Sequence, residues 1–407
     1  MTQPLHVQCC IAGGGPAGMM LGYLLGRAGV KTVVLEKHAD FLRDFRGDTV
    51  HPSTLTIMQE LGLLTEFLKL PHSELRALSV EIGDTCLKVA DFARVPGACQ
   101  FIALMPQWDF LNFLAEQGRR FPALQVMMST QVTSLTGHAG RVSGVQATTS
   151  AGPVEIRADL VVGCDGRAST LRAASGLVVQ DLGSPIDVLW FRLPKKAGDP
   201  EQILGHLGRD TMIVTIDRSD YWQCAYVIGK GGIGRVHAAG LEAFKTAVAN
   251  GARFLADRMD ELKSFDDIKL LSVSVDRLTT WSKPGLLCIG DAAHAMSPVG
   301  GVGINLAIQD AVATANLLAA KLKSGSLRDR DLDSVRRRRL FPVKVIQGFQ
   351  VAVHNRVLKP AISGRGRPVT VPWPLKLFNT YAWLRRWPAQ FLGLGVRPEH
   401  VRSADSP

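Results

Sequence analysis

The apolar positions at the start of the chain alternate between strand-like and helix-like spacing. Residues 6–12 form an apolar run of strand length, and residues 31–36 form a second run that is rich in β-branched side chains. Between them, residues 16–28 are rich in Met, Leu and Ala, which is typical of a helix. Helices are also predicted over 52–69 and 107–121. This alternation indicates a parallel sheet that is covered by helices.

A change of pattern near residue 180 indicates a second unit. Before it, short strands with glycine-containing turns are predicted over 125–164. A strand at 285–289 and a long helix from about Gly303 return to the first pattern, and the chain beyond is helical and interrupted by prolines. The strand-like segments in between are 188–193, 211–216, 221–228 and 270–275, with one predicted helix at 238–258.

The composition is that of a folded, water-soluble protein, with 46% hydrophobic and 20% charged residues in 407. There is no run of about 18 uncharged apolar residues, and the first seven residues lack a basic signal-peptide region, so we expect neither a membrane span nor secretion. The seven cysteines show no metal-ligand spacing, which predicts reduced thiols, no metal site and a cytoplasmic protein. Cys9 and Cys10 should point to opposite faces of the first strand, because side chains alternate along a strand.

Basic residues are concentrated near the C-terminus. Residues 321–407 contain 18 Lys/Arg and 5 Asp/Glu, a net charge of +13, and residues 1–320 carry −2. No nucleic-acid-binding motif accompanies this charge, so we expect no nucleic-acid partner. From Val371 to Leu394, packing on the rest of the protein is favoured over an interfacial helix on a membrane. The apolar side chains at helical spacing there are Leu377, Phe378, Tyr381, Leu384 and Phe391, near Lys376, Arg385 and Arg386.

A glycine-rich turn follows the first predicted strand. It reads Gly-Gly-Gly-Pro-Ala-Gly from Gly13 to Gly18, and Glu36 ends the second predicted strand 18 residues later. The first glycine permits a tight turn, the second lets a pyrophosphate approach the helix N-terminus, and the third lets helix and strand pack closely; the acid can bond ribose hydroxyls. The turn therefore predicts a dinucleotide site. A similar pattern from Gly229 to Gly234 has no following strand that ends in an acid, and we interpret it as a structural turn.

Two further segments favour FAD over NAD at that site. Residues 159–164 form a predicted strand that leads into Asp165, and residues 286–289 form another that leads into Gly290 and Asp291. With the glycine turn, these fingerprints span residues 9 to about 310. Here the chain resembles the class A flavoprotein monooxygenases, the aromatic-hydroxylase family of p-hydroxybenzoate hydroxylase and the ubiquinone-biosynthesis hydroxylases. The segment 392–399 is also similar to members of that family.

The resemblance implies an α/β fold in three parts. These are a discontinuous, Rossmann-like FAD-binding domain of the glutathione-reductase type, a β-sheet-rich substrate domain and a helical C-terminal region. We place the first part of the FAD-binding domain at 1–179, the substrate domain at 180–276, the second part of the FAD-binding domain at 277–325 and the C-terminal region at 326–407.

The resemblance also implies roles for the matching residues. Asp291 would bond a ribityl hydroxyl of FAD, and Asp165 lies in a segment used for FAD and NAD(P)H pyrophosphate recognition; capping is the alternative for both. Arg46 would reach the FAD phosphates, and Gln107 would contact the cofactor. We expect a buried contact for Asp291 and a partly solvated one for Glu36. The full predicted cofactor set is Gly13, Gly15, Pro16, Ala17, Gly18, Glu36, Lys37, Arg46, Gln107, Asp165, Gly290, Asp291, Pro298, Gly301, Val302, Gly303, Ile304 and Asn305.

The segment from Ser297 to Asn305 is predicted to hold the flavin ring. Its glycines bring backbone N–H groups close to a flat ligand, and the helix that begins there directs its positive dipole end at the ring. We assign Pro298 and Gly303 to ring positioning and no side chain to acid–base catalysis, because the family transfers oxygen from a C4a-hydroperoxyflavin. No flavin-linking motif is present, so FAD should be bound non-covalently. His51 and His294 are expected to be structural.

The activity implied is hydroxylation of a small, largely apolar phenolic compound with NAD(P)H and O2. Arg43 and Arg46 favour NADPH slightly. No arginine for a substrate carboxylate can be placed, and epoxidation, desaturation or dehalogenating hydroxylation on the same fold stays open. Candidate substrate contacts, with sheet packing as the alternative, are Trp190, Arg192, Tyr221, Trp222 and Gln223.

Overall fold

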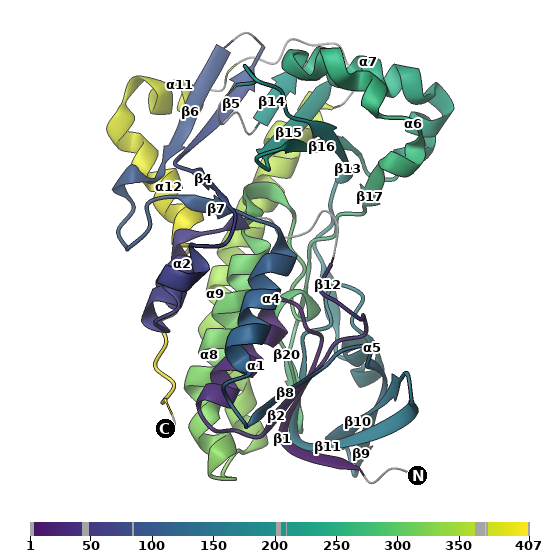
Figure 1. Cartoon of the computed structure of the whole chain (residues 1–407), viewed down its shortest axis with the longest axis vertical. Helices are drawn as coiled ribbons and strands as arrows, with labels where there is room; N and C mark the ends of the chain where they lie inside the picture. Colours follow the sequence, from purple (N-terminus) through teal and green to yellow (C-terminus); the bar gives the residue numbers. More distant parts are fainter. Residues whose placement is uncertain are drawn as a thin grey trace.

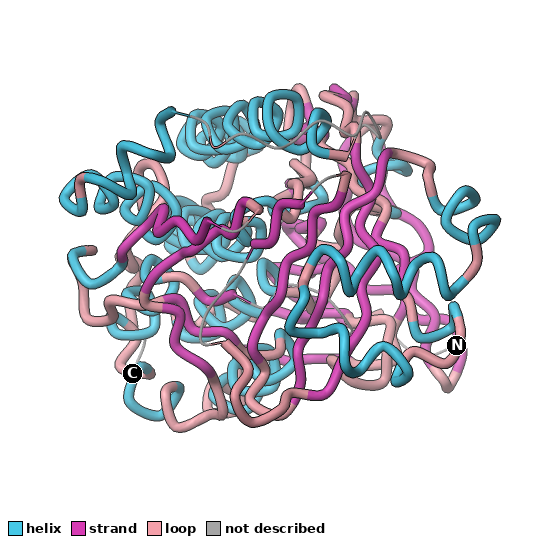
Figure 2. The backbone as a smooth tube through the Cα atoms, turned by 90° about the horizontal axis from the view of Figure 1, so that it is seen from above, coloured by secondary structure: helices cyan, strands magenta, loops and turns pink. Residues whose placement is uncertain are grey.

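The computed structural model describes residues 4–42, 49–83, 85–200, 205–208, 210–362, 371 and 373–405. Two sheets lie at opposite ends of the molecule, and long helices run between them (Figure 1). Seen from above, the strands cross the middle and helices surround them (Figure 2).

The first sheet contains eight strands within the described residues. Its path is β19-β20-β11-β1-β2-β8, in which β20, β11, β1, β2 and β8 run parallel to one another. Cys9 and Cys10 of β1 lie in two different core clusters, which confirms that they point to opposite faces. The strand bounds are β1 Leu5–Ala12, β2 Thr32–Leu35, β8 Leu124–Met127, β9 Gln131–His138, β10 Arg141–Thr149, β11 Gly152–Gly163, β19 Ser282–Lys283 and β20 Leu286–Cys288.

Three long helices pack beside this sheet. The first, α1 (Pro16–Arg27), starts at a proline, whose fixed φ suits a first helical turn. It packs against α8 (Gly303–Lys323) and α4 (Gln107–Gly118). A stretch that includes α8, Val299–Lys323, is long and apolar enough to cross a membrane, but 83% of its apolar window is buried in the protein. This burial is typical of the core helix of a globular fold. Along the middle of the molecule, α9 (Asp329–Val353) packs on α8 (Figure 1).

The second sheet has seven strands in the order β17-β13-β16-β15-β14-β5-β6. One face packs on α7 (Leu241–Gly251) through Phe244 and Val248, and α6 (Ile233–Ala239) precedes that helix. The other face packs on the turn at Val299 and on the C-terminal region. The strand bounds are β5 Ala77–Ile82, β6 Thr85–Asp91, β13 Ile186–Pro194, β14 Gly205–Gly208, β15 Thr211–Asp217, β16 Tyr221–Gly229 and β17 Lys269–Leu271.

Shorter elements connect these units. The small strands are β3 Thr49–Val50, β4 Ser73–Leu75, β7 Ile102–Leu104, β12 Val179–Asp181 and β18 Asp276–Leu278. The short helices are α2 Pro52–Glu60, α3 Leu64–Phe67, α5 Thr170–Ser175, α10 Lys359–Ala361, α11 Trp373–Thr380 and α12 Arg386–Gly393; a π-helical turn, His354–Leu358, follows α9.

The α/β fold class is confirmed, and the structure corrects three details. The helix expected at 52–69 is two helices, because Gly62 turns the chain at a φ of +71°. The helix expected at 238–258 is α6, α7 and a 3-10 segment, since Gly240 has a φ of +88°. The hairpin of β5 and β6 joins the second sheet by pairing with β14, although residues 1–179 were assigned to the first unit.

Candidate active site

Parallel pairing brings the three sequence fingerprints to one edge of the first sheet. β20, β11, β1 and β2 are neighbours and run in the same direction, so their carboxyl ends lie together. Gly290, Asp165, Gly13 and Glu36 follow directly from these four ends. Ligands of open α/β sheets bind at this edge.

The glycine turn has the geometry that its motif predicts. Gly13 has a φ of +104°, and a Cβ there would lie 2.4 Å from the carbonyl oxygen of Cys164. A Cβ at Gly18 would lie 1.9 Å from the carbonyl oxygen of Gly13, so helix and strand approach as closely as two backbones can. A Cβ at Gly15 would meet nothing within 4 Å. The backbone at the start of α1 is therefore open to a ligand.

Glu36 is more buried than expected, with 7% exposure. Its Oε2 accepts a hydrogen bond from the Gly14 backbone N–H at 2.9 Å, and its Oε1 accepts one from His38 N–H at 3.0 Å. The carboxylate therefore holds the glycine turn at the carboxyl edge of the sheet. The expectation of a partly solvated Glu36 is wrong, because the turn folds over the strand end.

Arg167 links the other two fingerprints. Its Nε donates to Oδ2 of Asp291 at 3.2 Å, and its Nη2 donates to the Met296 carbonyl at 3.3 Å. The Asp291 side chain is 33% exposed, so one side of the carboxylate is accessible from the carboxyl edge. Asp165 accepts from Ser169 Oγ at 2.5 Å and from Leu171 N–H at 3.1 Å, so both of its oxygens support the start of α5.

The loop expected to hold the flavin ring turns twice through glycines. Gly300 and Gly301 have φ values of +81° and +63°, and a Cβ at Gly301 would lie 2.5 Å from Oγ1 of Thr49. The side chain of Asn305 accepts from His51 N–H and donates to the carbonyls of Thr49 and Gly301. Asn305 therefore holds the loop in place through hydrogen bonds to the backbone of Thr49, His51 and Gly301.

Three polar side chains on α9 and the turn after it hold the same region, and the sequence analysis missed them. Gln350 donates to the carbonyls of Ser297 and Val299 and accepts from Ser297 N–H. The Oγ of Ser297 lies 2.7 Å from Nε2 of His354, and Gln347 donates to the Ala295 carbonyl. Positions 347, 350 and 354 share one helical face, and that stripe of polar residues was the available signal.

A buried ionic cluster supports the turn at Gly290 from behind. Asp310 accepts from Gly290 N–H and from Nε of Arg339, and it lies 2.6 Å from Nε2 of His294. Burial alone would raise the pKa of Asp310, but the charges and hydrogen bonds of His294 and Arg339 outweigh it and lower that pKa. Arg339 also pairs with Glu399, which ties the C-terminal segment into the core. The position of His294 agrees with a structural role.

The remaining predicted cofactor residues differ in what the structure shows. Gln107 is the first residue of α4 and half-buried, and Lys37 is exposed beyond β2. Arg43 and Arg46 lie outside the described residues. His51 is fully buried, its Nδ1 lies 2.7 Å from the Leu392 carbonyl oxygen, and burial lowers its pKa to about 4. His51 is therefore neutral near pH 7.

Strand alternation separates the predicted substrate residues. Trp190 and Ala225 belong to the face of the second sheet that packs near Val299, and Gln223 shares that parity with Ala225. Arg192 and Tyr221 follow the same parity, and the guanidinium of Arg192 lies 5.0 Å from the Tyr221 ring. Trp222 points the other way and donates to Asp199, so its assignment to the substrate is wrong.

A buried arginine, Arg218, was not found from the sequence. It lies directly after β15, is 7% exposed, and its Nε donates to Oε1 of Gln223 at 3.1 Å. Its positive charge also reaches Asp109 in the first turn of α4: burial raises the pKa of Asp109, and Arg218 opposes that rise. The polar sequence Arg-Ser-Asp does not predict that Arg218 is buried, because residues distant in the sequence cover its side chain.

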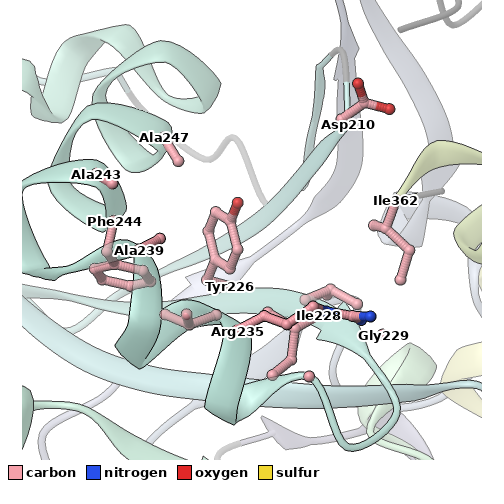
Figure 3. Close-up of a pocket in the computed structure, with 13 residues that line it drawn as sticks. Asp210, Tyr226, Ile228, Gly229, Arg235, Ala239, Ala243, Phe244, Ala247 and Ile362 are labelled. Atoms are coloured by element: carbon pink, nitrogen blue, oxygen red, sulfur yellow. The ribbon is translucent and has the colours of Figure 1, made fainter. Parts of the chain in front are cut away.

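The second glycine pattern forms a turn that is held by an acid from another strand. Asp187 accepts from Lys230 Nζ at 2.9 Å, from Gly231 N–H at 2.8 Å and from Val273 N–H at 3.0 Å. A pocket of 260 Å³ opens beside this turn, with Tyr226 and Phe244 in its wall (Figure 3). None of its lining residues comes from the carboxyl edge of the first sheet or from the Ser297–Asn305 loop.

The carboxyl edge and the loop together fit an extended dinucleotide that carries a flavin. Neither α1 nor α8 has a side-chain cap at its N-terminus, so their first N–H groups can face anionic groups of a ligand. Nη1 of Arg167 is buried and has no hydrogen-bond partner among the described residues. Phosphates near α1 and an electron-rich ring near α8 would supply the missing acceptors.

Comparison with known protein families agrees with this geometry. The family described as "FAD binding domain" matches residues 6–348. This chain belongs to that family. It is 33% identical over 336 residues to 6-methylpretetramide 4-monooxygenase of Streptomyces rimosus, covering 82% of this chain and 80% of the relative. The protein is therefore an FAD-dependent monooxygenase of the aromatic-hydroxylase type.

Two more distant similarities extend the comparison. The monooxygenase is 28% identical over 333 residues to a dialkyldecalin synthase of Streptomyces rugosporus, covering 77% of this chain and 65% of that relative. Its fold matches the crystal structure of p-nitrophenol 4-monooxygenase from Pseudomonas putida with a TM-score of 0.76 and 20% identity, covering 97% of this chain and 99% of the other.

Proposed function

We propose that the monooxygenase hydroxylates a phenolic, largely apolar aromatic compound with NAD(P)H as the reductant and O2 as the oxidant. The observation that carries this proposal is that the glycine turn and Asp291 lie at one edge of the first sheet, while Val299 of the Ser297–Asn305 loop packs on one face of the second sheet. Free thiols at all seven cysteines suit a cytoplasmic enzyme.

FAD would lie across the carboxyl edge without a covalent bond. Its pyrophosphate would meet the start of α1 at Gly15, its adenosine ribose would reach Glu36, and its ribityl chain would pass Asp291. Pro298 and the glycines at 300, 301 and 303 would border the ring. When bound, FAD accepts a hydride and activates O2. The expected slight preference for NADPH depends on Arg43 and Arg46.

The protein's own contribution is to orient the substrate ring and exclude water from it. The inner face of the second sheet carries Trp190, Ala225 and Val227, which form a dry wall opposite Val299. Gln223 fixes the Arg218 guanidinium at the edge of that wall. Arg218 would donate a hydrogen bond to the oxygen of the phenol. Its charge would stabilise this oxygen as an anion, the form in which the ring is electron-rich, since a buried cation strengthens a hydrogen bond to an anionic oxygen.

The test is turnover of the purified holoenzyme under labelled dioxygen. Simple phenols and 6-methylpretetramide are offered with NADPH or NADH, and products are weighed by mass spectrometry. We expect NAD(P)H-dependent gain of one labelled oxygen atom in the product. A product that lacks the label, or that forms without NAD(P)H, would refute the proposal. A product with the same mass as its substrate would instead support a ring-forming activity like that named for the dialkyldecalin synthase.

The substrate role of Arg218 has its own test. Arg218→Met should raise KM for the phenol by roughly tenfold or more, the loss expected for one hydrogen bond to a charged group. Arg235→Met removes an exposed arginine of α6 and should leave KM unchanged. Equal KM values for wild type and Arg218→Met would exclude the contact.

A further inference from the structure

The exposed aromatic side chains of this protein are gathered in one part of the chain. Trp373, Trp383 and Trp387 are 73%, 54% and 57% exposed, and Tyr381 is 50% exposed. Among the described residues, every exposed aromatic side chain lies between 341 and 387. Tryptophans elsewhere are buried or half-buried, and monomeric proteins rarely expose clustered apolar surface without a partner. We call residues 373–387 the aromatic segment.

The chain on both sides of the aromatic segment is rich in basic residues. Residues 334–398 contain 13 Lys/Arg and no Asp or Glu. Exposed Lys344, Arg356, Lys359, Lys376 and Arg386 have no carboxylate partner within the described part of the chain. The Arg386 guanidinium lies 5.3 Å from the Trp387 ring centroid, so charge and aromatic surface are presented together. The partner of this surface is therefore anionic and accepts apolar rings.

The aromatic segment is anchored on one side, which leaves its other side for a partner. Ala389 is buried, and Leu375 packs in the cluster under β6. Phe391 of α12 packs edge to face with Phe349 of α9 at 5.1 Å, and Arg385 donates to the carbonyls of Phe378 and Asn379. Figure 1 shows α11 and α12 on the outside of the molecule, beyond β6. Of the five apolar residues expected to pack on the protein, Phe391 does so, whereas Leu377 and Tyr381 are exposed.

We propose that the aromatic segment docks the monooxygenase on the surface of an anionic lipid bilayer. Trp and Tyr rings prefer the headgroup region, where an apolar body and a polar edge are both satisfied, and Lys and Arg are attracted to anionic headgroups. A second copy of the chain fits less well, because a two-fold interface would place this positive surface against itself. Docking of this kind would bring the substrate site close to apolar compounds that are dissolved in the membrane.

The experiment is co-sedimentation of the FAD-loaded protein with large vesicles. Vesicles of phosphatidylglycerol mixed with phosphatidylcholine should bind the protein at low salt and bind it more weakly, but measurably, at high salt, and vesicles of phosphatidylcholine alone should bind it weakly at both. Lys376→Gln/Arg386→Gln should weaken binding about tenfold or more, from the loss of two cations near the surface. Trp383→Ser/Trp387→Ser should weaken it by a similar factor at both salt concentrations.

A matched control removes the same charge from elsewhere. Lys69→Gln/Arg119→Gln takes away two exposed cations, 66% and 78% exposed, and should bind vesicles like wild type. FAD content, thermal unfolding and light scattering report whether each variant is folded and monomeric. Equal binding to both vesicle types, binding unaffected by the variants, or a dimer that dissociates in the Trp variant would overturn the proposal. No substrate is used, so the result is independent of the proposed hydroxylation.

Discussion

The two glycine turns have the same spacing and different surroundings. From Gly13 to Gly18, the third glycine allows α1 to cross β1 with no room for a Cβ, which would lie 1.9 Å from a carbonyl oxygen. From Gly229 to Gly234, a Cβ on the third glycine would meet nothing within 4 Å. The spacing is therefore not sufficient for a nucleotide site. The close approach of helix and strand distinguishes the first turn.

The acids beside the two turns also act differently. Glu36 belongs to the strand next to β1, and its carboxylate stands at the edge where a ribose would bind. Asp187 reaches the second turn from β13, and both of its oxygens accept hydrogen bonds from Lys230, Gly231 and Val273. Burial would raise the pKa of Asp187, but these hydrogen bonds outweigh it and hold the pKa below its ordinary value. The second acid stabilises a loop and is not available to a ligand.

The largest expected effect is at the first turn. Gly18→Ala forces a Cβ against the Gly13 carbonyl, so α1 must move away from β1 and the phosphate site opens. We expect purified Gly18→Ala to contain less than about a tenth of the wild-type FAD and to unfold at a lower temperature, since overpacking a backbone contact costs about 1–3 kcal/mol or more. Flavin absorbance per protein and a thermal melt measure both. Full flavin occupancy would show that close approach is not what defines the turn.

Asp187→Ala should be almost as damaging to stability and harmless to the cofactor site. It leaves the buried Val273 N–H and the Gly231 N–H without acceptors, which we expect to lower the free energy of unfolding by about 3 kcal/mol. Denaturant unfolding monitored by tryptophan fluorescence gives this value. FAD affinity, titrated separately on folded protein, should stay within about twofold of wild type. A large loss of FAD affinity would mean that the second turn affects the structure of the first.

Much of the contrast between the turns could be predicted from the sequence. The first strand, the glycines and Glu36 lie within 32 residues, from Leu5 to Glu36, so the local pattern defines that site. Asp291 lies at the same edge because parallel strands align their ends. The substrate side could not be predicted equally well. Arg218 is buried although it lies in a polar turn. Trp222 faces away from Tyr221 because neighbouring strand residues point to opposite faces, and the sequence does not show which face is turned toward the site. The missing information was which distant residues cover a side chain and which face of the strand points toward the site.

Mild acid should lower the free energy of unfolding, because His51 is buried in its neutral form. Burial lowers its pKa to about 4, whereas an unfolded histidine has a pKa of about 6.5, so the unfolded chain takes up a proton first as pH falls. Stability is then unaffected above about pH 6.5 and falls by roughly 3 kcal/mol between there and pH 4. His206 and His354, whose pKa values burial also lowers, add to the decline. His51→Gln should make the pH dependence shallower in denaturant titrations, and an unchanged slope would exclude His51 as a contributor.

A smaller effect on FAD affinity is expected at Glu36. Glu36→Ala removes the acceptor of the Gly14 and His38 N–H groups and the proposed ribose contact. FAD should bind roughly 10- to 150-fold more weakly, corresponding to about 1.5–3 kcal/mol for a hydrogen bond to a charged group. Asp291→Ala should weaken FAD binding at least as much, because it removes the proposed ribityl contact and leaves Nε of the half-buried Arg167 without its carboxylate acceptor. Fluorescence titration of the apoprotein with FAD tests the order, which the opposite ranking would contradict.

The smallest effect should come from the counterpart of the first substitution. Gly234 is the second residue of α6, is exposed, and has open space where a Cβ would stand. Alanine is the better helix former by up to about 1 kcal/mol, so Gly234→Ala should leave stability equal or slightly higher and FAD content unchanged. The same chemical change in the same motif position would then abolish one site and leave the other region intact. If Gly234→Ala instead lost flavin, the second turn would have to contact the cofactor, and the distinction drawn from the two backbones would fail.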